Sequence, residues 1–166
     1  MNDSSAEGFV KSHNAGGVMT IEFFHPKSNS MPASLLTVLT QHLHRANTPD
    51  VKVIVLKSSG SGAFCAGASF DELLAVTNEE EGFRFFMGFA NVINEMRKSD
   101  KLIIVRVHGK AIGGGVGIAA AADYAIGMDH SDIRLSELAI GIGPFVIGPA
   151  VQRKIGLSAF SQLAID

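Results

Sequence analysis

The chain has 166 residues, of which 46% are apolar and 18% charged, and its formal net charge is -2. This length is enough for one domain with a single core, and the composition is that of a globular protein rather than a disordered one. No run of Lys or Arg supplies the clustered cations that phosphate binding requires, which excludes a nucleic-acid surface. We therefore expect a single domain over residues 1–166, without nucleic acid among its partners.

Cysteine usage and the opening residues bear on the cellular compartment. Cys65 is the only cysteine, which excludes an internal disulfide, and the start MNDSSAEGF lacks the basic and apolar regions of a signal peptide. The longest uncharged stretch in the middle of the chain, Ala111 to Ala122, is too short to cross a bilayer. The six histidines show no metal-ligand spacing. We expect a soluble cytoplasmic protein with no membrane partner and no metal.

The first third of the chain predicts a hairpin, a helix and a strand. Phe9 to His13 and Val18 to Phe24 alternate apolar and polar residues, and the intervening Asn14-Ala15-Gly16-Gly17 tolerates the positive φ of a tight turn. Pro32 to Asn47 places leucines at helical spacing, with Pro32 in the first turn. Val51 to Lys57 is rich in Val and Ile, which predicts a buried strand.

The remainder alternates helices and strands, which predicts an α/β layered fold. A loop over 58–68 precedes a short helix, Phe70 to Leu74, and a long helix, Glu79 to Lys98, whose apolar residues form one face. A strand is expected over Leu102 to Val107. The later predicted elements are a small-residue helix from Gly113 through Ala121, strands near Tyr124 to Met128 and Ile133 to Leu135, and helices near Val146 to Ile155 and from Ser158.

Two strand-to-helix junctions are rich in small residues, Ala63 to Ser69 and Gly109 to Gly115. Small residues let a substrate approach the backbone, and the first amides of a helix have no partner within it. Two such amides facing one another would form an oxyanion hole for a thioester enolate. The alternative is that these glycines only permit tight turns or close helix packing.

Four segments resemble the signature of the crotonase (enoyl-CoA hydratase/isomerase) family, in its order and approximate spacing. They are Phe64-Cys65-Ala66-Gly67-Ala68, Val107 to Gly115, Ala122-Asp123, and Ser136 to Pro144. The resemblance implies a crotonase-like (ClpP/crotonase) spiral of ββα units, assembled as a homotrimer or hexamer. It also implies an acyl-CoA thioester as substrate, with coenzyme A entering only as part of that substrate and no other cofactor.

The resemblance also implies roles for individual residues and a limit to the domain. The amides of Ala68 and Gly114 would hold the thioester oxygen, and Ala66, Gly67 and Gly113 would contact the substrate. Lys27 would face a CoA phosphate, or it is a solvated surface lysine. Because family members continue well past the point where this chain stops, we expect a core domain truncated at its C-terminus, without the helical trimerisation region.

The acid and base expected of a hydratase in this family are two glutamates that share one water. Glu137 occupies the position of one, whereas Gly117 stands where the other would be. A single carboxylate favours isomerisation over hydration, because no water need be activated. Gly117 would then leave room for a substrate group or an anion. Asp71 would be a polar group near the acyl chain or, as we favour, a cap on the short helix.

Two other functions compete with this interpretation. Gly115-x-Gly117-x-x-Ala120 fits the loose pattern of dinucleotide binding in an NAD-dependent dehydrogenase, although it lies far from the end of its strand. The second is a non-catalytic acyl-CoA-binding protein that keeps the fold. The position of Glu137 separates this alternative from an enzyme, because a catalytic carboxylate must point into the pocket.

Overall fold

The computed structural model describes residues 8–165, so the first seven residues, on which part of the signal-peptide expectation rests, lie outside the described range. The strands are β1 (Phe9–Ala15), β2 (Val18–Phe24), β3 (Val53–Ser58), β4 (Leu102–Val107), β5 (Ala111–Ile112), β6 (Tyr124–Gly127) and β7 (Ile133–Arg134). The helices are α1 (Ala33–Arg45), α2 (Phe70–Leu74), α3 (Glu79–Lys98), α4 (Gly114–Ala121), the 3-10 helix η1 (Leu138–Ile140), α5 (Gly148–Ile155) and α6 (Leu157–Ile165).

Five strands form the main sheet, in the order β1-β2-β3-β4-β6. The hairpin predicted from the sequence is present, with β1 antiparallel to β2 and Ala15 opposite Val18. The other neighbours in this sheet pair in parallel, as expected for strands joined by helical crossovers. In the described part of the chain, a second sheet pairs β5 with β7, also in parallel. This small sheet joins the start of α4 to the segment that follows β7.

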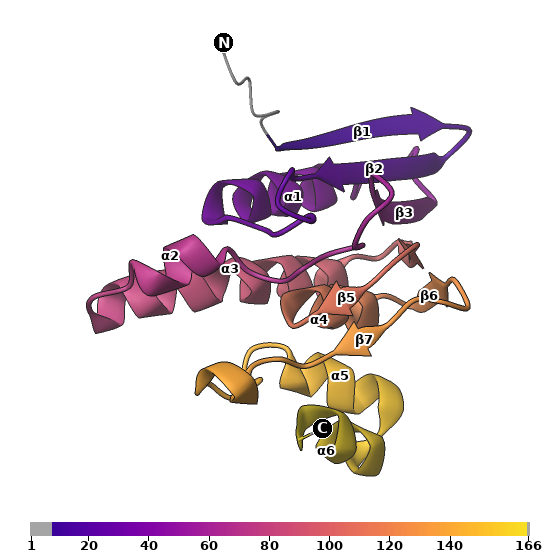
Figure 1. Ribbon diagram of the computed structural model, residues 1–166. Helices are drawn as coiled ribbons and strands as arrows, with labels where there is room; N and C mark the ends of the chain where they lie inside the picture. The colour runs from indigo at the N-terminus through magenta and orange to yellow at the C-terminus, as the bar shows by residue number, and fades with distance from the viewer. Residues whose placement is uncertain (1–7, 166) are drawn as a thin grey trace.

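The helices stack beside the strands in chain order. Contacts run from α1 to α3, from α3 to α4, from α4 to α5 and from α5 to α6. Figure 1 shows the chain descending in this way from the hairpin to the C-terminal helices, one strand-and-helix layer after another. The α/β layered fold expected from the sequence is therefore confirmed, and the layers follow one another as turns of a spiral.

Helix α3 follows directly from its sequence. Asn78 caps its start by accepting a hydrogen bond from the Glu81 amide at 3.0 Å, and acidic residues occupy its first turn while basic residues occupy its last. The predicted apolar face divides in two, because Phe89 and the residues beyond it are buried, whereas Phe85 is half-buried and Phe86 is exposed. The second half of this face packs into the core, and the first half lines a cavity.

One continuous core unites the sheet and the helices. Helix α4 lies at its centre and is apolar on every side, so that seven of its eight residues are buried. Such a helix requires small residues wherever another segment crosses it, and Gly115 meets the side chain of Cys65 in this way. Among residues 8–165, no helix combines the length and the hydropathy needed to cross a membrane.

Candidate active site

A cavity of about 200 Å³ opens between the start of α4, helices α2 and α3, and the segment after β7. Its lining comprises Ala66, Gly67, Ala68, Ser69, Phe70, Leu73, Phe85, Phe86, Phe89, Gly113, Gly114, Ser136, Glu137, Ile140, Ile142, Gly143, Pro144, Val146 and Ile147. Among these described lining residues, Glu137 alone carries an ionisable side chain. The cavity is therefore an apolar space with one carboxylate in its wall.

The first glycine-containing loop presents Ala68 to the cavity. Gly67 has a φ of 90°, which favours glycine, and its carbonyl accepts a 2.8 Å hydrogen bond from the Met31 amide. Ala68 forms an isolated parallel bridge with Met31 before α2 begins, and Ser69 caps that helix. Within residues 8–165, no acceptor receives the N–H of Ala68. The amide is thus available to a ligand.

The second loop brings Gly114 close to the first. Gly113 has a φ of 51° and its amide donates to Arg134 O at 2.9 Å, after which Gly114 begins α4. The Gly114 amide has no acceptor in the described chain, as expected for the first residue of a helix. A Cβ on Gly67 would lie 3.8 Å from Gly114 N, so the two loops meet directly.

The Glu137 carboxylate lies beside these loops. A Cβ on Gly113 would stand 3.1 Å from Glu137 Oε1, which shows how near the carboxylate is to the start of α4. The Glu137 carbonyl accepts hydrogen bonds from the amides of Ile140 and Ile142, at 3.2 and 3.0 Å. The buried Leu135 anchors the segment just before it. The side chain therefore enters the cavity from a fixed stretch of backbone.

Burial changes the acidity of Glu137. Its desolvation raises the pKa of the carboxyl above the usual 4.5, and the backbone amides of Glu137 and Ser136 offset part of this effect. Glu137 Oε2 is buried and has no hydrogen-bond partner among the described residues. A half-buried carboxylate with an unpartnered oxygen is suited to accept and return a proton.

Gly117 does not provide the room expected of it. It lies in the second turn of α4, and a Cβ added there would come within 2.5 Å of Ile147 Cγ2 and 3.1 Å of Ile93 Cδ1. Ile147 is 3% exposed and itself lines the cavity, whereas Gly117 is not part of the lining. The space beside Gly117 is therefore filled by a buried aliphatic side chain rather than left open to a substrate group or an anion.

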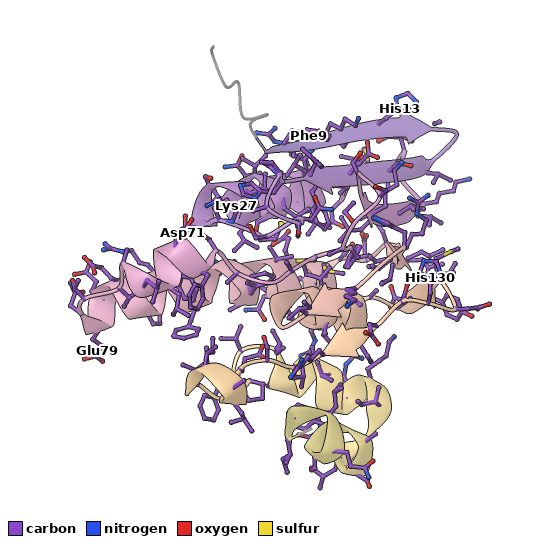
Figure 2. All side chains as sticks on the ribbon, in the orientation of Figure 1. Phe9, His13, Lys27, Asp71, Glu79 and His130 are labelled. Carbon is purple, nitrogen blue, oxygen red and sulfur yellow. The ribbon has the colours of Figure 1, made fainter. Side chains whose placement is uncertain are left out.

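Lys27 and Asp71 also lie outside the cavity lining. The two side chains pair with each other on the surface, where Figure 2 labels them close together, and both are exposed. The Lys27 ammonium, through this hydrogen bond and its charge, lowers the pKa of the Asp71 carboxyl. The favoured role of Asp71 as a helix cap is wrong, because Ser69 accepts the hydrogen bond from the Glu72 amide and caps α2.

The dinucleotide interpretation has no site to support it. Gly115 packs against Cys65, with 2.7 Å between an added Cβ and either Cβ or the carbonyl oxygen of Cys65, and Gly117 packs against Ile147. The glycines of that pattern are thus covered by protein. Burial also raises the pKa of the Cys65 thiol to about 12, so Cys65 stays a protonated packing residue.

The sequence interpretation missed much of the apolar lining. Phe85, Phe86 and Phe89 belong to the predicted apolar face of the long helix, and helical spacing does not reveal the cavity that they line. Ile142 lies in the motif Ser136 to Pro144 and Ile147 in a predicted helix, and neither position indicates a role at the site. Their only sequence signal is a high density of apolar residues around Pro144, which does not reveal what they face.

Comparison with known proteins assigns a family. The family model for enoyl-CoA hydratase/isomerase matches residues 13–165. Ethylmalonyl-CoA decarboxylase of Gallus gallus is 27% identical over 92% of this chain and 51% of its own length. The mitochondrial 3-hydroxyisobutyryl-CoA hydrolase of Bos taurus is 27% identical over 93% and 42%, and carnitinyl-CoA dehydratase of Escherichia coli K12 is 29% identical over 78% and 49%.

Solved structures agree with this assignment. A Legionella pneumophila structure described as an enoyl-CoA hydratase/isomerase (crotonase) superposes with a TM-score of 0.89 at 34% identity, over 95% of this chain and 62% of the other. Enoyl-CoA hydratase of Bacillus anthracis gives a TM-score of 0.86 at 26% identity, over 93% and 61%. Of the decarboxylase, the hydrolase and the dehydratase named above, the chain spans about half the length. With its spiral of strand-and-helix layers and its matching family signature, the chain belongs to the enoyl-CoA hydratase/isomerase (crotonase) family.

Proposed function

We propose that the chain binds an acyl-CoA thioester in this cavity and uses Glu137 to move one proton on and off carbon. The amides of Ala68 and Gly114 would hold the thioester oxygen while it carries the enolate charge. One observation carries the proposal: the single ionisable side chain of the described lining lies beside two backbone amides that have no acceptor of their own.

The two amides suit the charge that develops during enolate formation. When a proton leaves the α-carbon, negative charge moves to the thioester oxygen, and fixed N–H donors stabilise it without reorganising. Gly114 adds the favourable N-terminal end of α4, whose dipole attracts negative charge. The backbone around Ala66, Gly67 and Gly113 lets the thioester approach closely, because none of these residues carries a side chain larger than methyl.

Glu137 supplies the proton transfer. In a 3-enoyl thioester, its carboxylate would remove a proton from C2, leaving a dienolate, and the same carboxyl group would return that proton to C4. The product is the 2-enoyl isomer, and no water or oxidant is consumed. The raised pKa of Glu137 brings its basicity closer to the value that favours both halves of this transfer.

Hydration is less well supported than isomerisation. A hydratase of this family uses two glutamates on one water, and here Gly117 and Ile147 together replace the second carboxylate with a filled apolar contact. The names of the relatives share CoA thioesters as substrates but differ in reaction. We therefore propose one-base enolate chemistry on an acyl-CoA, with isomerisation as its simplest form. Assembly as a homotrimer or hexamer belongs to the same proposal.

The test follows 3-enoyl-CoA and 2-enoyl-CoA in deuterated water, recording bond migration, hydration and exchange at C2. Glu137→Gln keeps the shape of the side chain and removes the base, so bond migration and exchange should fall by about 10²- to 10⁴-fold. The matched control is Glu79→Gln. Glu79 is an exposed glutamate at the first residue of α3, where Figure 2 labels it, and it does not line the cavity.

Each outcome has a distinct meaning. Migration or exchange that is lost in Glu137→Gln and kept in Glu79→Gln supports the proposal. Hydration that survives Glu137→Gln would move the catalytic group elsewhere. Measurable binding of a CoA ester without any turnover would favour the non-catalytic acyl-CoA-binding protein.

A further inference from the structure

The loop that carries Ala68 has little regular structure of its own. It joins β3 to α2 over residues 59–69, and its only β-bridges to other described segments are the isolated pairs Cys65 with Ala111 and Ala68 with Met31. A loop of this kind is held where neighbouring segments bind its backbone. The position of the Ala68 amide therefore depends on residues far from it in sequence.

Asn29 is the buried polar side chain that faces this loop. It lies between β2 and α1, is 3% exposed, and has a φ of 56°. Asparagine tolerates this left-handed backbone better than most residues. The preceding Ser28 has a φ of 53°, so the turn presents the Asn29 side chain inward through two unusual backbone conformations in succession.

Every hydrogen-bonding group at the end of the Asn29 side chain has a partner. Its Nδ2 donates to Ser59 O at 2.9 Å and to Ala63 O at 2.8 Å, and its Oδ1 accepts from the His25 amide at 2.8 Å. A flipped amide would set Oδ1 against two carbonyls, so only one orientation satisfies all three contacts. The side chain thus fixes the distance between two points of the loop.

The same short segment also holds the loop just before Ala68. Met31, two residues after Asn29, is fully buried and donates its amide to Gly67 O at 2.8 Å. From the other side, Cys65 exchanges backbone hydrogen bonds with Lys110 and Ile112. Segment 29–31 therefore binds the carbonyls of Ser59, Ala63 and Gly67, all of which precede the amide at the cavity.

We infer that Asn29 is a positioning residue, which sets the Ala68 amide against the thioester oxygen by holding the 59–69 loop. The inference rests on the proposed function of that amide. Asn29 touches no substrate itself, since it does not line the cavity. A displacement of about 1 Å at such a donor lowers catalysis by about 10²-fold, so a small movement of the loop is enough to be measured.

Two variants separate the side chain from the backbone conformation. Asn29→Asp keeps the size and the acceptor for the His25 amide but loses both Nδ2 donors. Asn29→Gly keeps the left-handed conformation and removes the side chain, so it remains usable if the buried aspartate prevents folding. Ile54→Val, at a fully buried position of β3, is the control for a general loss of stability.

The measurement is the carbonyl stretch of bound butyryl-CoA labelled with ¹³C at the thioester carbon, because hydrogen bonds to that oxygen lower its frequency. The affinity for butyryl-CoA, the melting temperature and the turnover of 3-enoyl-CoA are recorded in parallel. For Asn29→Asp and Asn29→Gly we expect the band to move back toward its value in free butyryl-CoA. We also expect kcat to fall on the order of 10- to 100-fold while Kd changes by less than about threefold.

The outcomes distinguish this inference from the proposed function. If the wild-type chain binds butyryl-CoA without lowering the carbonyl frequency, the proposed oxyanion hole fails. If the wild type lowers it and the Asn29 variants lower it equally, the positioning role is overturned. A band that moves back as far in Ile54→Val also overturns the role, because the effect then follows stability alone.

Discussion

Two walls of the cavity are built in different ways. The amide wall, formed by Ala66, Gly67, Ala68, Gly113 and Gly114, presents mainly backbone. It is fixed by two backbone hydrogen bonds, one that Met31 donates to Gly67 O and one that Gly113 donates to Arg134 O. The apolar wall consists of residues with large apolar side chains, Phe70, Leu73, Phe85, Phe86, Ile140 and Ile142. Phe70, Ile140 and Phe86 remain 56%, 47% and 37% exposed.

Under the proposed function, this difference would separate the reaction from the choice of substrate. Substitution by any residue except proline keeps the backbone N–H, but it moves that N–H when the packing behind it changes. The apolar wall, by contrast, contacts a ligand only through side chains that are exchanged without disturbing the core. Relatives named as a decarboxylase, a hydrolase and a dehydratase of different CoA thioesters fit such a division.

The largest effect is expected from packing behind the amide wall. A Cβ on Gly109 would lie 2.3 Å from Gly62 O, a backbone atom that cannot move without the loop. Gly109→Ala should lower kcat/KM by about 10²-fold and destabilise the fold by about 1–3 kcal/mol, measured by turnover and urea unfolding.

Gly62 provides the matched control for this prediction. A Cβ added to Gly62 would meet no heavy atom of residues 8–165 within 4 Å, although Gly62 lies on the other side of the same contact. Gly62→Ala should therefore keep both activity and stability. Equal behaviour of the two variants would contradict the idea that the packing behind the amide wall matters.

The next effect concerns pH, through the carboxylate between the two walls. Glu137 acts as a base only when ionised, and burial raises its pKa above 4.5. The kcat/KM should therefore fall about tenfold per pH unit below that raised pKa, and its midpoint should lie above 4.5. A midpoint at or below the ordinary glutamate value would contradict the assignment of Glu137 as the base.

Folding stability should change in the opposite direction over the same window. The folded state holds the Glu137 proton more tightly than the unfolded state, so this proton contributes to the free energy of unfolding. The contribution is complete below the unfolded pKa and is lost as the pH rises through the folded pKa. Denaturant unfolding of the wild type and of Glu137→Gln across this range isolates the contribution. The difference in free energy of unfolding between the wild type and Glu137→Gln should become constant at both ends of this pH range.

A smaller effect is expected at the apolar wall. Phe86→Leu should change the ratio of KM values for short and long acyl groups by about 3- to 10-fold, and it should leave kcat for the short substrate unchanged. Phe83→Leu is the control, because Phe83 is on the same helix, is 65% exposed and does not line the cavity. A loss of kcat in Phe86→Leu would show that the two walls are not independent.

The smallest effect is expected at the surface pair outside both walls. Lys27→Met removes an exposed ammonium that pairs with Asp71, so the melting temperature should stay unchanged. Affinity for an acyl-CoA and for the matching acyl-pantetheine, which lacks the nucleotide phosphates, should change by less than about twofold. A loss confined to the CoA ester would instead assign Lys27 to a CoA phosphate.

Elements with local causes could be predicted from the sequence. The limits of β2, β4 and α3 agree with the prediction, because alternation, helical spacing and the Asn78 cap are properties of consecutive residues. Helix α1 begins one residue later than predicted, since Pro32 is its N-cap. The ordered motifs also brought Ala68, Gly114 and Glu137 into one interpretation, and the structure places all three at one cavity.

Features made by distant residues could not be predicted in this way. β5 has two residues and is defined by its pairing with β7, so it is too short for an alternation of apolar and polar residues to predict it. The filling of the space beside Gly117 depends on Ile147, thirty residues away along the chain and carried by another segment. The contacts of Asn29 with Ser59 and Ala63 are of the same non-local kind.

The short pairing of β5 with β7 has a consequence for local opening. The segment of Glu137 is held beside Gly113 by the pairing of β5 with β7, two strands of two residues each. By contrast, β3 and β4 lie inside the five-stranded sheet. Breaking the few hydrogen bonds of β5 and β7 would withdraw the carboxylate and leave the main sheet intact. The amides of Ala111 and Gly113 should therefore exchange hydrogen faster than those of β3, and Glu137 would leave the cavity by local opening rather than by global unfolding.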